Sequence, residues 1–287
     1  MWITIKVSLL LTTHFYDCII LNVSRSAVTE RRNMTTEESF DLTKKKGYMV
    51  VKGNDLIQKN RFELSLTEQK TIAYICSMIQ PMKTEESGFQ LEYEFNIREY
   101  CKICDISYDS GKNYTFIKNT LQKLSDRSMW VTIGEEEVLC RWLAKARANK
   151  RSGIARIKLD EDLVPYLFDL KEQFTQYQLY NVLGMKSAFS VRIYELMKSY
   201  SFRHTIEIDL DKLKKLLMVE DVKSYNRFAD FRRFVLEKAQ SEINELTDID
   251  MSFEPIKTGR KVTSIRFTIE EKFKEKGKNY GKREMES

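Results

Sequence analysis

The feature that most constrains the fold is the stretch from Ser224 to Thr268, where one helical pattern is followed by two alternating ones. The spacing of its apolar residues by three and four predicts one long helix with a buried stripe. That stripe consists of Tyr225, Phe228, Phe231, Val235, Ala239, Ile243 and Leu246. Two short strand-like runs follow, at 251–253 and 262–268, separated by a basic turn that contains Gly259. A helix followed by a hairpin with a cationic tip predicts a winged helix, whose helix enters the major groove while the tip reaches phosphate.

The same order of elements occurs twice along the chain. Each copy is expected to contain a long helix, a short strand, a short helix, a patterned helix and a hairpin. Ile97, Tyr100 and Cys104 match Leu210, Leu213 and Leu217, and Asn113 matches Asn226, each 113 positions later. The sequence therefore predicts an α+β fold with two tandem winged-helix domains related by a pseudo-repeat. Two such modules in one chain suit successive grooves of a DNA duplex.

Local signals place the elements of both copies. A capping box at Ser65–Glu68 begins the first long helix, which Pro81 ends, and Asp209 is the expected cap of the second short helix. The remaining expected helices cover 97–104, 111–125, 160–171, 175–183, 185–200 and 209–217. The expected strands cover 48–51, 90–95, 129–133, 138–143, 154–159 and 205–208. The predicted domains are an N-terminal extension over 1–47, expected to be disordered, two winged-helix domains over 48–159 and 160–270, and a charged tail over 271–287.

Composition sets the wider limits. A chain of 287 residues with a net charge of +6 permits a polyanionic partner. Its five cysteines have no framework spacing, which predicts reduced thiols and a cytoplasmic protein. No apolar run is long enough to cross a membrane, so we expect no membrane partner. Residues 1–33 differ from the rest, and we interpret Met34 as the functional start, with a signal peptide as the alternative.

Two basic runs without Asp or Glu coincide with the predicted wings. The first contains Arg141, Lys145, Arg147, Lys150, Arg151, Arg156 and Lys158. The second contains Lys257, Arg260, Lys261 and Arg266. If both lie on phosphate, neutralising six to ten phosphates should lower affinity by roughly 10³ or more between 50 and 200 mM salt. The alternative is that each run is only a solvated hairpin.

The two patterned helices begin with polar side chains suited to DNA. The first begins with Lys112, Asn113, Tyr114 and Lys118, and the second with Ser224, Asn226, Arg227 and Arg233. Arginine suits guanine O6 and N7, and asparagine suits adenine. Helix capping and surface solubility would also explain each position singly, so the prediction rests on the group.

The sequence contains little material for catalysis. It has two histidines, His14 and His204, and no glycine-rich phosphate loop. Cys101 and Cys104 have zinc-knuckle spacing, but no second pair lies nearby in the sequence, so we interpret both as core residues. We therefore predict a protein that is not an enzyme and that needs no metal or other cofactor.

Several segments in order resemble the iteron-binding plasmid replication initiator (Rep) proteins, and the resemblance covers about 48–269. They include VVKGNDLIQKNRFELSLTEQKTIAYICSMIQP, SGKNYTFIKNTLQKLSDRSMWV, FTQYQLYNVLGMKSAFSVRIYELMKSY and FADFRRFVLEKAQSEINELTDIDMSFEPIKTGRKV. The resemblance implies an initiator that binds direct repeats in the plasmid origin, helps open the duplex, and recruits the host initiator and helicase. It also implies a monomer–dimer equilibrium, dimer contacts in the first domain, and repression of the initiator's own gene through an inverted repeat.

Transferred onto this chain, the resemblance adds Arg232 to the second recognition helix, beside Asn226, Arg227 and Arg233. Lys257, Arg260 and Lys261 would form the wing of that domain. Two other functions remain open at this point. A double winged-helix transcriptional regulator would use the same residues. A nicking rolling-circle initiator would need a tyrosine nucleophile and a histidine cluster for its metal, and the histidines for such a cluster are missing from the sequence.

Overall fold

A computed structural model of the chain describes residue 45 and residues 47–79, 89–106, 109–168 and 170–272. Most of the predicted N-terminal extension, Met34, Pro81 and the tail after Lys272 lie outside these residues. Residues 46–287 belong to one unit. Among the described residues, no helix is both long and apolar enough to cross a membrane.

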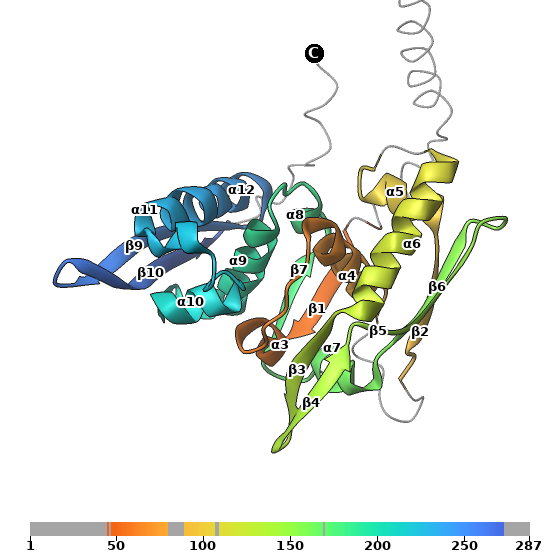
Figure 1. The fold of residues 1–287 in the computed structure, drawn as a ribbon, viewed down its shortest axis with the longest axis horizontal. Coiled ribbons are helices and arrows are strands. Elements are labelled where there is room, and N and C mark those ends of the chain that lie inside the picture. Colours follow the sequence, from red (N-terminus) through yellow and green to blue (C-terminus); the bar gives the residue numbers. More distant parts are fainter. Residues whose placement is uncertain (1–44, 46, 80–88, 107–108, 169, 273–287) are drawn as a thin grey trace, which may run out of the picture. The chain divides into compact units, whose positions relative to one another are not determined.

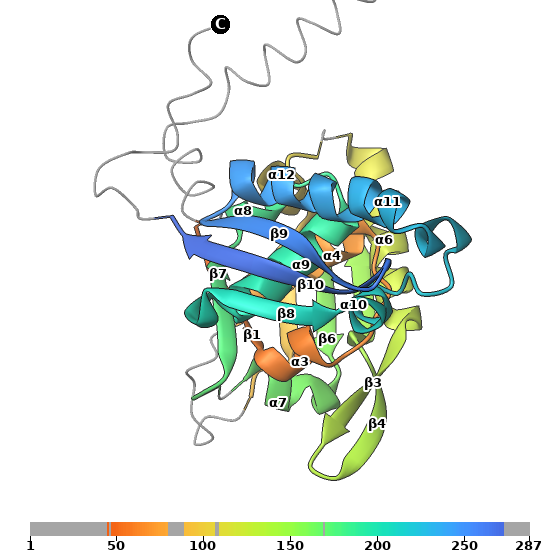
Figure 2. The same ribbon diagram turned by 90° about the vertical axis from the view of Figure 1, so that its left-hand side faces the viewer.

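The second half of the chain has the winged-helix arrangement that the opening stretch predicts. Strands β8 and β9 both pair antiparallel with β10, which gives the sheet order β8-β10-β9. Helices α11 and α12 cover one face of this sheet (Figure 2). The alternating residues Ile265, Phe267 and Ile269 of β10 are fully buried. The elements are β8 (Thr205–Asp209), α10 (Leu210–Leu216), α11 (Phe228–Phe231), a π-helical segment η5 (Arg232–Glu237), α12 (Lys238–Leu246), β9 (Ile249–Thr258) and β10 (Lys261–Glu271).

The first half repeats this topology, as predicted. Strands β2 and β5 pair antiparallel with β6, which gives the order β2-β6-β5. The elements are β2 (Glu92–Asn96), α5 (Ile97–Ile103), α6 (Ser110–Asp126), β5 (Leu143–Asn149) and β6 (Ile154–Leu159). An additional hairpin, β3 (Ser128–Ile133) and β4 (Glu136–Arg141), separates α6 from β5 (Figure 1). The predicted strand 138–143 therefore ends earlier, and β5 is a separate strand that the sequence analysis did not predict.

The chain also contains a separate two-stranded sheet. Strand β1 (Met49–Gly53) pairs antiparallel with β7 (Phe174–Gln178). The helix predicted over 175–183 was therefore wrong in its first half, and only α8 (Tyr180–Leu183) is helical. Thr175 and Tyr177 are buried while Gln176 between them is exposed, which is strand alternation. This segment is a strand because it pairs with a strand more than a hundred residues away, and the local spacing of its residues does not reveal that partner.

The remaining elements are helical. They are α3 (Asn54–Gln58), α4 (Leu66–Met78), η2 (Glu161–Leu163), α7 (Val164–Leu167), α9 (Ala188–Ser199), η3 (Ser201–Arg203) and η4 (Lys223–Asn226). The capping box is present: the Ser65 N–H donates to Glu68 at 2.7 Å, and the Glu68 N–H donates to the Ser65 hydroxyl at 3.4 Å. Asp209 caps α10 by accepting from the Lys212 N–H at 2.8 Å. Every residue from 191 to 197 in α9 is buried, so this helix is enclosed on all sides.

The long helix predicted from Tyr225 onward begins later and is not regular. Residues 223–226 form the 3₁₀ segment η4, Arg227 is extended, and the helix starts at Phe228. The buried stripe consists of Phe231, Val235, Ala239 and Ile243, at strict steps of four. In an α-helix each such step rotates the stripe by about 40°. The π turn over Arg232–Glu237 has a longer period, which keeps the stripe against the sheet.

Candidate nucleic-acid interface

The segment that leads into the second recognition helix and the first turns of that helix present polar residues to solvent. Ser224, Asn226, Arg227, Arg232 and Arg233 are all exposed. Arg227 Nε lies 3.6 Å from Asp230 Oδ2, and Arg232 Nε donates to Glu237 Oε1 at 2.8 Å. These pairs hold both guanidinium groups near the helix while leaving donor N–H groups available, because arginine has five of them. The predicted residues are therefore all exposed, but Ser224, Asn226 and Arg227 precede the helix, and only Arg232 and Arg233 lie on it.

The second wing is a turn between β9 and β10 with cations at its tip. Gly259 has φ 63°, a backbone conformation that glycine adopts without steric cost. Lys257, Arg260 and Lys261 are exposed around it, and among the described residues none forms an ion pair with them. The tip is thus a compact cationic group suited to phosphate.

Arg266 belongs to the same basic run but is neutralised in the structure. Its Nη1 donates to Glu254 at 2.8 Å, and its Nη2 donates to Glu207 at 3.3 Å. Glu254 on β9 and Glu207 on β8 stand beside Arg266 because they are its partners in the sheet register. These carboxylates raise the pKa of Arg266. A run without acids in the sequence is therefore not free of acids in space.

The first recognition helix matches the prediction only in part. Lys112 and Lys118 are exposed, with Lys112 Nζ 3.5 Å from Asp109. Asn113 is only 4% exposed, and its side-chain oxygen accepts from the Asp109 N–H. The Tyr114 hydroxyl donates to the carbonyl of Ala148 on β5 at 3.3 Å. Asn113 and Tyr114 therefore serve the local structure, and the exposed surface of this helix start carries the two lysines.

The first wing is the β5–β6 hairpin, and its cations extend along a strand as well as around the tip. The Asn149 side chain accepts from the Arg151 and Ser152 N–H groups and shapes the turn, where Lys150 and Arg151 are exposed. Arg147 on β5 faces Arg156 on β6, which is paired with Glu94 at 2.7 Å. Among the described residues, no acid forms an ion pair with Lys145 or Arg147. The sequence analysis did not single out Lys145 as a site residue, although its membership of the basic run was visible.

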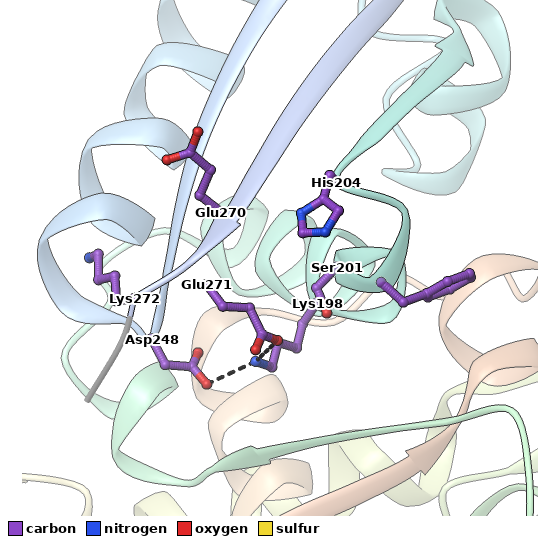
Figure 3. A pocket seen from close by; sticks show the side chains of 8 residues that line it. Lys198, Ser201, His204, Asp248, Glu270, Glu271 and Lys272 are labelled. Atoms are coloured by element: carbon purple, nitrogen blue, oxygen red, sulfur yellow. Dashed lines mark hydrogen bonds and ion pairs between the residues drawn. The ribbon is translucent and has the colours of Figure 1, made fainter. Parts of the chain in front are cut away.

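One pocket is lined by residues other than those of these surfaces. It is a cavity of about 890 Å³ lined by Lys198, Ser201, Phe202, His204, Asp248, Glu270, Glu271 and Lys272 (Figure 3). Lys198 Nζ lies 3.0 Å from both Asp248 and Glu271. Burial would lower the pKa of Lys198, but the two carboxylates outweigh it and raise that pKa. Lys198 is thus held in ion pairs with two carboxylates of the pocket.

The geometry of the described residues favours neither a metal site nor an activated nucleophile. No group of three or more His, Cys, Asp or Glu in the described part of the chain could hold a metal ion. Cys101 and Cys104 are buried on α5, and burial raises the pKa of the Cys101 thiol. Burial also raises the pKa of Tyr100, Tyr177 and Tyr194. These shifts disfavour the ionised form that a tyrosine or cysteine nucleophile requires.

The fold and the exposed cations define a class: a double winged-helix protein with one recognition helix and one basic wing in each domain. Comparison with known proteins identifies the family. A model of the initiator replication protein, WH1, matches residues 49–198, and one of the initiator Rep protein, WH2, matches residues 209–269. The chain belongs to the initiator Rep protein family, and the resemblance seen in the sequence is confirmed.

Two relatives and one solved structure are similar to this chain. A "Replication initiation protein" from Escherichia coli is 25% identical over 229 residues, which cover 77% of this chain and 69% of that protein. An "Uncharacterized 27.6 kDa protein" from Escherichia coli is 24% identical over 124 residues, which cover 43% of this chain and 52% of that protein. The crystal structure of the Pi initiator protein in complex with iteron DNA matches with a TM-score of 0.63. That match has 19% identity and covers 78% of this chain and 97% of the other, so it shows the shared fold. The predicted boundary at residue 160 lies inside the WH1 match and stays a prediction.

Proposed function

We propose that this protein initiates plasmid replication by binding direct repeats in its origin, in the cytoplasm, without catalysis and without a cofactor. The observation that carries the proposal is the placement of exposed cations at equivalent places in both domains, on the recognition helix and on the wing. Family membership supports the initiator role, and the Pi initiator, which has the same fold, is described in a complex with iteron DNA. Duplex opening and recruitment of the host initiator and helicase complete the proposed role.

The proposal assigns different roles to the recognition helix and the wing of the second domain, and DNA binding tests it. We expect the recognition helix to read bases and the wing to anchor phosphate. Full-length protein would be titrated by fluorescence anisotropy against labelled DNA from upstream of its own gene and against a scrambled duplex, at several salt concentrations, with and without ATP and Mg²⁺. Binding should be repeat-dependent, should weaken steeply with salt, and should ignore both additives. Equal affinity for the two duplexes would refute the proposal.

Two double variants separate the roles. Arg227→Ala with Arg233→Ala should weaken binding to the repeats more than binding to scrambled DNA, each base contact contributing about 1–3 kcal/mol. Lys257→Ala with Lys261→Ala should weaken both alike and flatten the salt dependence. If the two double variants behave identically, the division between helix and wing is wrong.

We further propose that the dimer, which would repress the initiator's own gene at an inverted repeat, forms through the β3–β4 hairpin of the first domain. Trp130 and Leu139 are cross-strand partners there, with 60% and 53% of their surfaces exposed. Arg141 ends this strand pair, and an acidic turn lies at the opposite end, formed by Glu135 with Glu136 and Glu137 at the start of β4. A two-fold axis through the apolar pair would bring Arg141 of one protomer near the acidic turn of its partner.

Sedimentation of the full chain checks the dimer surface. Trp130→Ala with Leu139→Ala should shift the protein towards monomer while leaving its melting temperature close to wild type, because both side chains are exposed. Phe202→Ala removes an exposed aromatic ring elsewhere and should leave the dimer unchanged. A dimer that persists in the hairpin variant would place the contact on another surface.

A further inference from the structure

Phe234 is an apolar side chain on the DNA-facing helix start that the core does not use. It is 52% exposed, whereas Val235 and Leu236 next to it are fully buried. Arg232, Arg233 and Phe234 are three consecutive exposed residues of the π segment. The sequence signal was available, since Phe234 falls outside the periodic stripe that predicts the helix.

The surroundings of Phe234 are cationic. The Arg233 guanidinium lies 5.3 Å from the centre of its ring. The Arg232 guanidinium lies 6.0 Å from the ring of Phe253 on β9. Arg227 precedes them at the start of the helix. An exposed ring within a group of arginines is suited to a polyanion that presents a local apolar group. The arginines attract the negative charge, and the ring gains from contact with the apolar group.

DNA has one apolar feature in the major groove, the C5-methyl group of thymine. We infer that Phe234 contacts a thymine methyl group in the repeat and contributes to the sequence specificity of this initiator. The inference rests on the proposed function, because it requires the second recognition helix to enter the major groove. The flanking arginines would hold the helix on the duplex, and the ring would distinguish thymine from the other bases.

Replacing thymine by uracil tests this contact, since the two bases differ only by that methyl group. Labelled repeats would be prepared with uracil at one thymine position at a time and titrated with the full-length protein by anisotropy. One or two positions should weaken binding by wild type about fourfold, which corresponds to about 0.8 kcal/mol for a buried methyl-sized group. Phe234→Ala should bind the thymine and uracil versions of those positions equally.

Two further variants make the result specific. Phe234→Leu keeps an apolar contact and should retain part of the discrimination. Phe202→Ala removes an exposed ring outside the interface, 69% exposed, and should discriminate as wild type does. Circular dichroism melting of each variant ensures that folded proteins are compared.

The outcomes separate the inference from the function on which it rests. If wild type prefers the repeats but ignores every uracil substitution, methyl recognition is wrong and the proposed function stands. If Phe234→Ala still discriminates thymine from uracil as wild type does, another residue reads the methyl group. If wild type does not prefer the repeats over scrambled DNA, the proposed function itself fails.

Discussion

The two winged-helix domains share a topology but distribute charge differently. In each, an arginine of the central strand pairs with a glutamate of the first strand: Arg156 with Glu94, and Arg266 with Glu207. On the other side of that arginine the first domain has Arg147 and the second has Glu254. One sheet therefore carries an extended cationic row, whereas the other is neutralised and leaves its charge to the helix and the wing tip. The shared fold sets the positions of these residues in the sheet, and single substitutions decide which surface carries unpaired cations.

The largest expected effect is a loss of stability in a variant that also tests whether the two domains unfold together or independently. Lys52 on β1 and Glu195 on α9 form a buried ion pair of 2.6 Å, and the Tyr177 hydroxyl of β7 donates to the same carboxylate at 2.5 Å. One residue earlier on α9, the Tyr194 hydroxyl donates to Asp248, at the edge of the second domain, at 2.7 Å. Lys52→Met should lower the free energy of unfolding by about 3–5 kcal/mol, because it leaves the buried carboxylate without its lysine.

Urea unfolding measures this effect with two probes. Trp130 and Trp142 both lie in the first domain, so in a Trp2→Phe background tryptophan fluorescence reports that domain, while far-UV circular dichroism reports both. Coincident transitions in wild type and variant would show that the domains unfold together, and separate transitions would show independence. Lys145→Met, at an exposed position, should change stability by less than about 0.5 kcal/mol. An effect of Lys52→Met as small as this control would contradict the importance of the pair.

The same ion pair predicts a pH dependence. Burial alone would raise the pKa of Glu195, but Lys52, Tyr177 and Arg192 outweigh burial and lower it below its usual 4.5. The carboxylate therefore stabilises the fold fully above pH 4.5, and this contribution is lost as the pH falls through the lower folded-state pKa. The difference in stability between wild type and Lys52→Met should shrink over that acidic range in urea titrations at stepped pH. A difference that stays constant to low pH would contradict the sign of the shift.

The next effect tests the contrast between the two sheets directly. If Arg147 faces phosphate, Arg147→Ala should flatten the slope of log affinity against log salt by about 0.9, the value for one phosphate contact. Arg266→Ala should change the slope less, since Glu207 and Glu254 already neutralise that guanidinium. Both slopes would be measured by anisotropy on one duplex. Equal flattening by the two variants would mean that the carboxylates do not screen Arg266 from DNA.

Sequence reasoning succeeded where the cause was local. The caps at Ser65 and Asp209 and the stripe from Phe231 to Ile243 depend on residues a few positions apart, and all are present. It failed where partners are distant: β7 is a strand because β1 pairs with it. For the candidate interface, the exposed cations of the helices and wings could be predicted from composition and order.

The finer features of the interface depend on tertiary neighbours. Asn113 is buried against its own helix start, and Arg266 meets carboxylates 12 and 59 residues away. Neither arrangement follows from local pattern. The exposure of Phe234 could have been predicted, because an aromatic residue outside an amphipathic stripe has no place in the core of that helix.

The smallest expected effect concerns Cys101 and Cys104, whose spacing resembles half of a zinc site. The repeat gives an independent argument, because Cys104 stands 113 positions before Leu217 and both side chains are 6% exposed in equivalent cores. A position filled by leucine in one copy and cysteine in the other is a packing position. Treatment with EDTA should therefore leave the melting temperature unchanged, and elemental analysis of the purified chain should find no stoichiometric zinc. A melting temperature that falls on chelation and recovers with added Zn²⁺ would show that the first domain holds a metal that the second does not, which would make the two domains differ in what stabilises them as well as in charge.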